Sequence, residues 1–359
     1  MTQQTTPTTD GGTDDRTDAT AKRSARPDAD DGGETRSEPR PVCAGVIGVG
    51  AMGENHARVY SECRDVDLVG VTDLDADLAE AVARRYGTTP LQMDDLLAAC
   101  DVVTVAVPTH AHYETVRACF DAGAHVLVEK PIAETVEQGR DLERRAAEAG
   151  LVLQVGHIER FNPAVETVAG VIEDLEVIAV EAERLGPPVD RTATDGVVSD
   201  LMIHDIDVVS ALLGDQPSVL SATSTDDGQY ATTTMSCDEV IVSLTASRRT
   251  QKKVRRLTVT ASECLVEVDY LQQSVLIHRN SYPEYVTDDG TNRHRHESVV
   301  ERPRIENGEP LKREVEAFVE AVRDGSDPVV TAEDGIAALE TVERIDRFVA
   351  DTAEELIAR

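Results

Sequence analysis

Basic residues are scarce in this sequence, and lysine is the scarcer of the two strong bases. The 359 residues include 68 acidic and 35 basic side chains, a formal charge of -33, and five of the 35 are lysines. Nucleic acids and anionic membranes bind proteins through excess Lys and Arg, so neither is expected as a partner. An acid-rich, lysine-poor composition instead predicts a halophilic protein whose self-repulsion is screened by abundant cations.

Other absences narrow the class of protein. No apolar run approaches the roughly 18 residues that cross a membrane, and no secretion signal stands at the N-terminus. The six cysteines are scattered without a C-x-x-C pair, which argues against a disulfide framework or a zinc site and predicts reduced, buried thiols. We therefore expect a soluble, cytoplasmic protein.

The first 40 residues differ in composition from the rest. They are mainly Thr, Asp, Gly, Pro and Arg, with almost no large apolar side chain, so they cannot bury enough surface to offset the entropy of ordering. We expect a disordered acidic tail over residues 1–40, a first domain over 41–155 and a second over 156–359. The tail holds nine acidic and six basic residues, so most of the charge belongs to the folded body.

Apolar runs alternate with amphipathic stretches across the first domain. Strand, helix, strand spacing of this kind predicts right-handed crossovers and a doubly wound parallel sheet of the Rossmann type. The expected strands are 42–47, 67–71, 102–107, 125–128 and 151–155, and the expected helices are 51–61, 75–86, 112–121 and 135–149.

The second domain has a different order of elements. Strands follow one another after the first helices, which predicts an α+β domain with a largely antiparallel, open-faced sheet covered on one side by helices. Asn162 is expected to open one helix, with Pro163 as its first residue. The other expected helices are 198–213, 311–323 and 332–357, and the expected strands are 177–183, 218–223, 240–246, 254–260, 264–269 and 274–278.

A glycine motif stands between the first predicted strand and helix. Gly48, Gly50 and Gly53 form G-x-G-x-x-G. The first glycine permits the tight turn, the second lets a pyrophosphate approach the backbone, and the third allows close helix packing. Ala51 and Met52 begin the helix whose N-terminus faces the phosphates. The motif in this context predicts dinucleotide binding.

An acidic residue closes the second predicted strand. Asp73 lies 25 residues beyond Gly48, near the spacing of about 20 expected for the acid that binds the adenosine ribose. No Arg follows it directly to accept a 2'-phosphate, so NAD is favoured over NADP as the cofactor.

Two further stretches follow strands at the edge where an open parallel sheet places its ligands. One is residues 106–112, and the other contains Lys130, the only lysine of the first domain in a chain that otherwise uses arginine. The alternative for Lys130 is a solvated side chain before a loop proline. The cofactor contacts expected here are Pro108, Thr109, His112, Glu129 and Lys130.

A third stretch combines carboxylates with an imidazole. On a helix, Asp200 and His204 are four residues apart and share a face, and Asp207 follows. A carboxylate beside an imidazole raises its pKa and fixes its tautomer, which makes His204 a candidate base near neutral pH. The alternatives are two metal ligands or a surface ion pair. Because no second His stands one turn away, no metal is expected.

Together these motifs resemble the Gfo/Idh/MocA family of NAD(P)-dependent sugar and polyol oxidoreductases. The likeness extends from about residue 42 to the C-terminus. It rests on the glycine motif, on Glu129-Lys130-Pro131 and on Asp200-x-x-x-His204-x-x-Asp207.

The resemblance implies catalytic roles for Lys130, His204 and Asp200. Lys130 and His204 would flank the substrate carbon that faces the nicotinamide, with Asp200 orienting His204 and with Pro131 in a cis peptide. Removing hydride from a secondary alcohol requires removal of its proton, and an ammonium can hydrogen-bond the developing alkoxide. Which of Lys130 and His204 is the formal base stays open, because they would titrate as a coupled set.

Within the family, residues 155–163, 184–187 and 195–201 resemble the archaeal UDP-N-acetylglucosamine 3-dehydrogenases. The diphosphate of such a substrate is matched by arginine, which binds phosphate oxygens bidentately. The implied substrate contacts are His157, Arg160, Asn162, Arg184, Arg191 and His204. Packing is the alternative for His157 and helix capping alone for Asn162. The basic cluster at 293–296 is interpreted as a solvated loop.

The resemblance therefore implies an NAD-dependent enzyme that oxidises the 3-hydroxyl of a UDP-N-acetylhexosamine to the 3-keto sugar. Oxidation of a free sugar or polyol such as an inositol stays open, as does NAD-dependent glycoside cleavage through a transient 3-keto intermediate. A small-molecule substrate is expected, together with a homodimer or homotetramer assembled through the sheet of the second domain.

Overall fold

The computed structural model describes residues 40–188, 196–225, 227–280, 284–288, 291–295 and 298–357. The tail prediction, apart from residue 40, lies outside these residues, and so does Arg191. Within the described ranges, no helix combines the length and the apolar character needed to cross a lipid bilayer.

The N-terminal part contains a six-stranded parallel sheet in the order β3-β2-β1-β4-β5-β6. Its central strands are buried on both faces, as expected for a parallel sheet that helices cover on each side. The strands are β1 (Val42–Ile47), β2 (Val66–Thr72), β3 (Thr89–Pro90), β4 (Val102–Val105), β5 (His125–Glu129) and β6 (Leu153–Gly156), and the helices are α1 (Ala51–Glu62), α2 (Ala76–Tyr86), α3 (Met93–Ala99), α4 (Thr109–Asp121) and α5 (Val136–Ala149).

The C-terminal part contains an eight-stranded sheet in the order β16-β13-β12-β11-β7-β10-β9-β8. All neighbours run antiparallel except β7 and β10, which are parallel. The strands are β7 (Val177–Leu185), β8 (Ser218–Thr225), β9 (Tyr230–Cys237), β10 (Val240–Ser247), β11 (Val254–Ala261), β12 (Cys264–Asp269), β13 (Ser274–Asn280) and β16 (Ser298–Glu301). A separate hairpin joins β14 (Glu284–Asp288) and β15 (Thr291–Arg295). The predicted fold class is confirmed.

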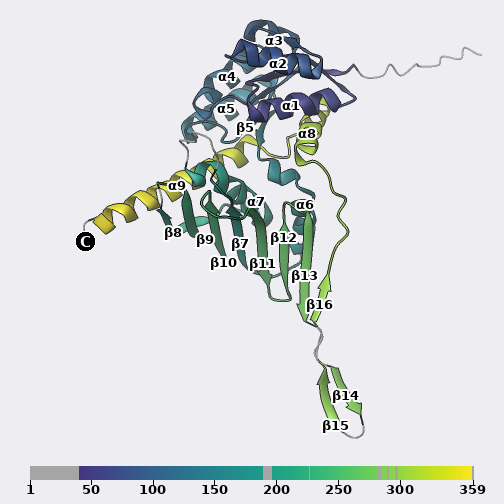
Figure 1. Ribbon diagram of the computed structural model, residues 1–359, viewed down its shortest axis with the longest axis vertical. Coiled ribbons are helices and arrows are strands. Elements are labelled where there is room, and N and C mark those ends of the chain that lie inside the picture. The colour runs from purple at the N-terminus through teal and green to yellow at the C-terminus, as the bar shows by residue number, and fades with distance from the viewer. Residues whose placement is uncertain are drawn as a thin grey trace, which may run out of the picture. The chain divides into compact units, whose positions relative to one another are not determined.

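Helices cover one face of this second sheet (Figure 1). Residues of α6, α7 and α9 share a core cluster with alternate residues of its strands. The other face exposes apolar side chains, among them Ile178, Leu220 and Ile241. Self-association through this open face stays a prediction. The helical elements are η1 (Ile158–Phe161), α6 (Pro163–Ile172), the π-helix η2 (Val198–Met202), α7 (Ile203–Leu213), α8 (Pro310–Asp324) and α9 (Ala332–Ile357).

The last two helices return to the N-terminal part. Leu311 and Phe318 of α8 pack in the same core cluster as Tyr60 of α1, and Ile336 of α9 joins the cluster beneath α5. Figure 1 shows α8 beside α1, and α9 contacts both α5 and β8. The C-terminal segment therefore ties the two sheets together and holds the strand ends that carry the site.

Candidate active site

The glycine motif has the geometry that a dinucleotide needs. Gly48 has φ of +83°, and a Cβ atom on Gly53 would lie 1.8 Å from the carbonyl oxygen of Gly48. Gly50 begins α1 without a side-chain cap, and a Cβ atom there would meet nothing within 4 Å. The first amides of α1, at Ala51 and Met52, are therefore open to an anionic ligand.

Asp73 fastens this loop to the end of β2. Its Oδ2 accepts from the amide of Val49 at 2.7 Å, and its Oδ1 accepts from the amide of Asp75 at 2.9 Å. Each carboxylate oxygen keeps a second lone pair that can accept from a ribose hydroxyl. Leu74, fully exposed beside it, is an apolar side chain at the same edge that sequence reasoning missed.

The side chain of His112 joins two strand-end loops. It is buried, and its ring nitrogens each lie 2.8 Å from a carbonyl oxygen, those of Pro131 and Val107. Burial lowers its pKa below 6.5. The prediction that this side chain contacts the cofactor is corrected, because both nitrogens are occupied within the protein. Pro108 and Thr109 lie at the N-terminus of α4, facing the same sheet edge.

Glu129 is held by a histidine from α1. His56 Nε2 lies 2.9 Å from Glu129 Oε1, and the His56 side chain is wholly buried. Burial alone would raise the pKa of Glu129, but the hydrogen bond with His56 and the charge of Lys130 lower it overall. The ionised carboxylate thus supports the loop that carries Lys130.

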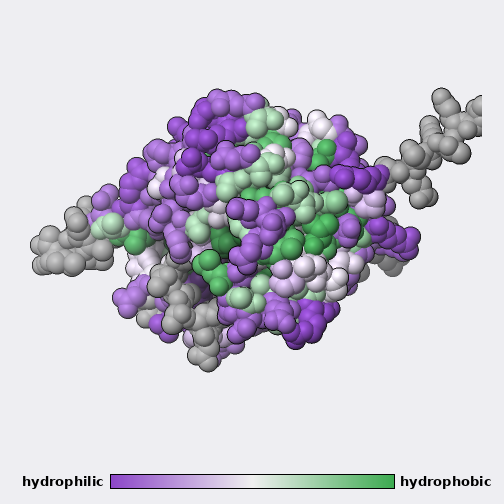
Figure 2. Space-filling model, turned by 90° about the horizontal axis from the view of Figure 1, so that it is seen from above, coloured by the Kyte–Doolittle hydropathy of each residue, from purple (hydrophilic) through white to green (hydrophobic). Residues whose placement is uncertain are grey.

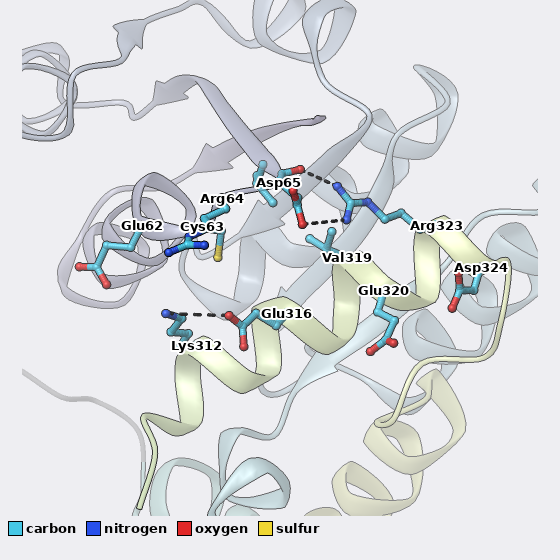
Figure 3. A pocket seen from close by; sticks show the side chains of 11 residues that line it. Glu62, Cys63, Arg64, Asp65, Lys312, Glu316, Val319, Glu320, Arg323 and Asp324 are labelled. Carbon is cyan, nitrogen blue, oxygen red and sulfur yellow. Dashed lines mark hydrogen bonds and ion pairs between the residues drawn. The ribbon is translucent and has the colours of Figure 1, made fainter. Parts of the chain in front are cut away.

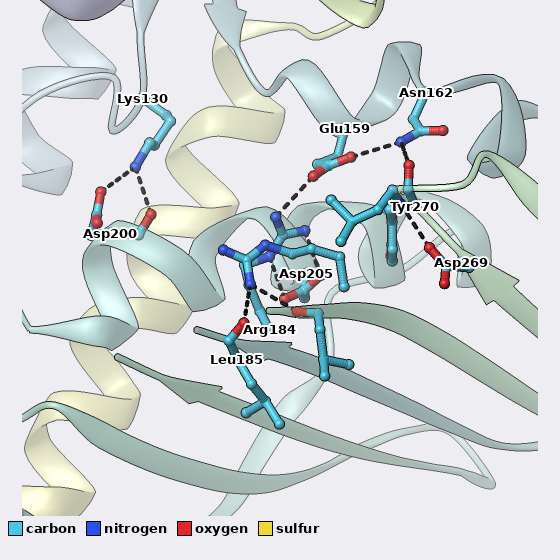
Figure 4. Close-up of polar contacts among 12 residues, drawn as sticks. Lys130, Glu159, Asn162, Arg184, Leu185, Asp200, Asp205, Asp269 and Tyr270 are labelled. Carbon is cyan, nitrogen blue, oxygen red and sulfur yellow. Dashed lines mark hydrogen bonds and ion pairs between the residues drawn. The ribbon is translucent and has the colours of Figure 1, made fainter. Parts of the chain in front are cut away.

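Lys130 points from β5 toward the second sheet and reaches Asp200 (Figure 4). Its Nζ donates to the Asp200 carbonyl at 2.6 Å and to Asp200 Oδ1 at 2.9 Å, and the side chain is 14% exposed. The peptide between Lys130 and Pro131 is cis, as the resemblance implied. Two predicted catalytic residues that lie 70 positions apart are thus brought together.

Asp200 does not orient His204, and this expectation was wrong. Residues 198–202 form a π-helix, so the i, i+4 geometry of an α-helix does not apply there. The Asp200 carboxylate accepts from Lys130 and, on its other oxygen, from Arg248. Arg248, which follows β10, is almost buried and was missed because nothing in its local sequence marks it.

Among the described residues, no carboxylate forms a hydrogen bond with His204. Its Nδ1 is buried without a partner among the described residues. Burial, followed by the charges of Lys130 and Arg184, lowers its pKa well below 6.5. The predicted rise in its pKa is therefore corrected: His204 is a neutral imidazole at neutral pH.

His157 lies edge-on to His204, with ring centroids 6.4 Å apart. It is buried, and neither of its nitrogens has a partner among the described residues. Burial lowers its pKa to about 3, with Lys130 and Arg160 adding to the effect. The two neutral imidazoles beside a lysine leave polar atoms for a ligand, so the substrate contact of His157 stays a prediction.

Arg184 belongs to a buried ion-pair network (Figure 4). Its Nε and Nη2 donate to Asp205 at 2.8 Å each, and its Nη1 donates to Glu159 at 2.8 Å. The side chain is 5% exposed. The prediction that Arg184 binds a diphosphate is corrected, because the guanidinium is buried and its charge is already paired with two carboxylates of the fold.

Asn162 caps a helix. Its Oδ1 accepts from the amide of Ala164, the second residue of α6, and its amide group donates to the carbonyl of Tyr270 and to Glu159. The side chain is buried. The capping interpretation is therefore supported by these contacts, and the ligand role is corrected.

The remaining arginine candidates have different outcomes. Arg160 Nη1 lies 3.4 Å from Oδ1 of Asp207, a buried carboxyl whose pKa burial raises to about 7. The 16% exposed side chain of Arg160 keeps its substrate role as a prediction. Arg191 lies outside the described residues, and of the cluster at 293–296 only the backbone of 293–295, in β15, is described. No group of three metal-ligating side chains occurs in the described ranges.

A surface groove of about 560 Å³ lies away from this site, between the end of α1 and α8 (Figure 3). Its charges pair within the groove, Lys312 with Glu316 at 3.9 Å and Arg323 with Asp65 at 3.6 Å. It lies away from the glycine motif and from Lys130, and none of the predicted site residues lines it. The strand-end site is therefore the candidate active site.

Both halves of the chain match models of one protein family. The NAD-binding Rossmann fold of the Gfo/Idh/MocA oxidoreductase family matches residues 42–157, and the C-terminal alpha/beta domain of that family matches residues 169–347. The chain belongs to the Gfo/Idh/MocA family. It is therefore an oxidoreductase with an NAD-binding Rossmann domain.

Two curated relatives point to different substrates. The chain is 35% identical over 242 residues to a UDP-N-acetylglucosamine 3-dehydrogenase of Acidithiobacillus ferrooxidans, covering 65% of this chain and 76% of that protein. It is 30% identical over 337 residues to an inositol 2-dehydrogenase of Rhizobium meliloti, covering 88% of this chain and 98% of that protein. Neither match tests the predicted halophilic, archaeal origin.

Solved structures show the same fold. UDP-N-acetylglucosamine 3-dehydrogenase GnnA from Acidithiobacillus ferrooxidans matches with a TM-score of 0.78 and 29% identity, over 86% of this chain and 97% of that one. GenD2 from gentamicin A biosynthesis, in complex with NAD, matches with a TM-score of 0.74 and 26% identity, over 88% and 95%. The glycine motif, open at the start of α1, fits the NAD that this family domain binds.

Proposed function

We propose that this protein oxidises the 3-hydroxyl of a UDP-N-acetylhexosamine to the 3-keto sugar with NAD as oxidant. The observation that carries the proposal is the juxtaposition of Lys130, held by Asp200, with the neutral imidazole of His204. The similarity to a UDP-N-acetylglucosamine 3-dehydrogenase in sequence and in structure supports the choice of substrate.

The polar groups of the site divide the work of alcohol oxidation. NAD, when bound, accepts the hydride from the carbinol carbon. The Lys130 ammonium uses two of its three N–H groups to bond Asp200. Its third N–H group donates a hydrogen bond to the alcohol oxygen and stabilises the developing alkoxide. The neutral imidazole of His204 accepts the hydroxyl proton. Asp200 is a positioning residue, since its carboxylate aims the lysine.

Burial makes this arrangement suited to hydride chemistry. Lys130 is 14% exposed, and His157 shields His204 on one side. A site with little water strengthens the hydrogen bond from the ammonium to the alkoxide. The ion pairs of Arg184 with Asp205 and Glu159 stabilise the protein next to these catalytic groups.

Oxidation of an inositol is the second candidate. The inositol 2-dehydrogenase of Rhizobium meliloti matches almost the whole of this chain, whereas the nucleotide-sugar relative matches 65% of it. The correction of Arg184 also removes one of the three arginines assigned to a diphosphate. Both candidates use the same reaction at Lys130 and His204.

A substrate panel separates the two candidates. NADH formation is measured with UDP-N-acetylglucosamine, N-acetylglucosamine, UDP-glucose and myo-inositol in molar KCl, and the product is identified by mass spectrometry and NMR. The proposal predicts the highest kcat/KM for UDP-N-acetylglucosamine and a 3-keto product. A higher kcat/KM for myo-inositol would replace the proposed substrate with the second candidate.

A further inference from the structure

Arg255 occupies an unusual position in the second sheet. It lies in β11 directly opposite Arg184 of β7. Further along the same two strands, Leu257 opposes Ala182, and both are buried in the core beneath the helices. Because strand side chains alternate with a period of two, Arg255 and Arg184 both face the helix-covered side. Like charges directly opposite each other are unfavourable, so this pair requires a compensating interaction.

Among the described residues, the neighbouring carboxylates form ion pairs with only one of these arginines. Arg184 takes both oxygens of Asp205 and one of Glu159. Arg255 donates from Nη1 to the carbonyl oxygens of Leu185 and Val254, each at 2.8 Å, and both acceptors are neutral. Among the residues that the structure describes, none forms an ion pair with Arg255. A half-buried arginine without a direct ion pair is unexpected in a chain with 68 acidic side chains.

The register of β11 with β7 places Arg255 beside Arg184, and two electrostatic effects agree with a position near the catalytic groups. Burial and then the neighbouring Arg184 lower the pKa of Arg255, whereas Asp205, Glu159 and Asp200 raise it. Its charge also adds to burial, Lys130 and Arg184 in lowering the pKa of His204. The guanidinium of Arg255 therefore lies close enough to the His204 imidazole for its charge to disfavour the protonated ring.

We propose that Arg255 binds a phosphate oxygen of the substrate's diphosphate, the role that the sequence assigned to Arg184. The carbonyl oxygens of Leu185 and Val254 hold Nη1, which leaves Nη2 and Nε to donate to an anion. A phosphate would give Arg255 the direct charged partner that Asp205 and Glu159 give Arg184. The inference rests on the proposed nucleotide-sugar substrate and adds the residue that distinguishes it from a neutral polyol.

The first test compares Arg255→Gln with Arg256→Gln. Arg256 is the next residue on the same strand, exposed and on the opposite face, so it is a matched control. We expect Arg255→Gln to raise KM for UDP-N-acetylglucosamine about 10- to 100-fold, the range for loss of a charge-assisted hydrogen bond. The KM for NAD stays unchanged in both variants. An unchanged KM for the UDP-sugar in a folded Arg255→Gln enzyme would overturn the assignment.

A second measurement separates this inference from the proposed function. Calorimetry follows inorganic pyrophosphate binding to the enzyme saturated with NAD, so that the glycine loop is filled. Pyrophosphate should bind the wild type and Arg256→Gln but not Arg255→Gln, even if UDP-N-acetylglucosamine proves not to be a substrate. Glucuronate is the comparison anion; binding of glucuronate without pyrophosphate would assign the site to a sugar carboxylate and refute the phosphate.

A third variant keeps the test decisive if Arg255→Gln does not fold. Arg255→Lys retains the charge but loses the planar arrangement of donors. It should bind pyrophosphate about tenfold more weakly than the wild type. Equal binding by the wild type and Arg255→Lys, with Arg255→Gln unfolded, would refute a bidentate phosphate contact.

Discussion

The site depends on individual side chains whose environments differ from those their spacing suggests. Asp200 and His204 look like a carboxylate and imidazole pair in sequence, yet Asp200 bonds Lys130 and Arg248 instead. The family resemblance identified the residues that meet, and the place of Lys130 after a strand of the parallel sheet agreed with it. Local spacing assigned the wrong partner to Asp200, because the π-helix changes which side chains share a face.

The pairing of Arg184 shows a second limit of local patterns. Its partners Glu159 and Asp205 lie 25 and 21 positions away in the sequence, and local patterns carry no information on such contacts.

The protonation state of His204 gives a prediction for the pH profile. Burial lowers its pKa, so the neutral form that accepts the proton persists well below pH 6.5. We expect kcat/KM to stay level as pH falls from about 8 to about 6, the range in which an ordinary His becomes charged. Steady-state kinetics with the cofactor saturating measures this. An acid limb with an apparent pKa at or above that of an ordinary His, absent in His204→Gln, would contradict the neutral imidazole.

Glu314 gives a prediction for stability. It is wholly buried on α8, and neither carboxylate oxygen has a partner in the described part of the chain. Burial, then the charge of Glu129, raises its pKa well above 4.5. The folded protein thus binds a proton that the unfolded chain releases above that pH, so this group lowers the free energy of unfolding as pH rises. Glu314→Gln should remove that loss, about 1.4 kcal/mol for each unit of pKa difference.

Urea titrations at about pH 5 and pH 8 test this stability effect. Glu320→Gln, an exposed residue of the same helix, is the control and should change the free energy of unfolding by less than about 0.5 kcal/mol at either pH. If Glu314→Gln is less stable than the wild type at pH 8, the carboxylate is ionised and paired in the fold.

At the scale of elements, the sequence predicted most of the regular structure. Helices with sequence signals at their ends were predicted correctly. Asn162 caps α6 and Pro163 is its first residue, and α9 has the predicted bounds. The short elements β3 and α3 were missed because they have two and seven residues, too few to show the hydrophobic period of a strand or a helix. The Thr-rich strand β9 was also missed, since Met235 is the one large apolar residue among the four on its buried face.

The Asn162 cap connects α6 to the second sheet, and its loss should be costly. Asn162→Ala removes the acceptor of the Ala164 amide and leaves the Tyr270 carbonyl unpaired and buried. We expect a loss of about 1–3 kcal/mol in the free energy of unfolding. Asn55→Ala, which removes only a bond to the carbonyl of Ala51 on the exposed side of α1, should cost less than about 0.5 kcal/mol. Equal losses in the free energy of unfolding for the two variants, measured by chemical denaturation, would show that the Asn162 cap does not stabilise the fold.

At the scale of the whole molecule, the charge of -33 is the dominant property. In the face drawn in Figure 2, hydrophilic residues occupy the rim around a central hydrophobic band. Like charges on such a surface repel one another and favour unfolding unless salt screens them. The scarcity of lysine also made Lys130 conspicuous in the sequence, and the structure places it against Asp200.

The charge predicts that salt stabilises the fold. Raising KCl from about 0.1 M to about 1 M shortens the Debye length from about 10 Å to about 3 Å. The Tm should therefore rise by several degrees, whereas sucrose at equal osmolality, which screens no charge, should have a smaller effect. A Tm that is insensitive to KCl, or that falls with it, would contradict the predicted adaptation to high salt.

The central claim is that Lys130 serves the oxidation of a UDP-sugar by NAD. The most direct measurement is the rate of NADH formation from UDP-N-acetylglucosamine by the wild type, by Lys130→Ala and by Lys312→Ala, a lysine of α8 far from the strand ends. We expect turnover by the wild type and Lys312→Ala, and a loss of about 100-fold or more in kcat for Lys130→Ala with unchanged NAD affinity. Wild-type turnover by Lys130→Ala would contradict it.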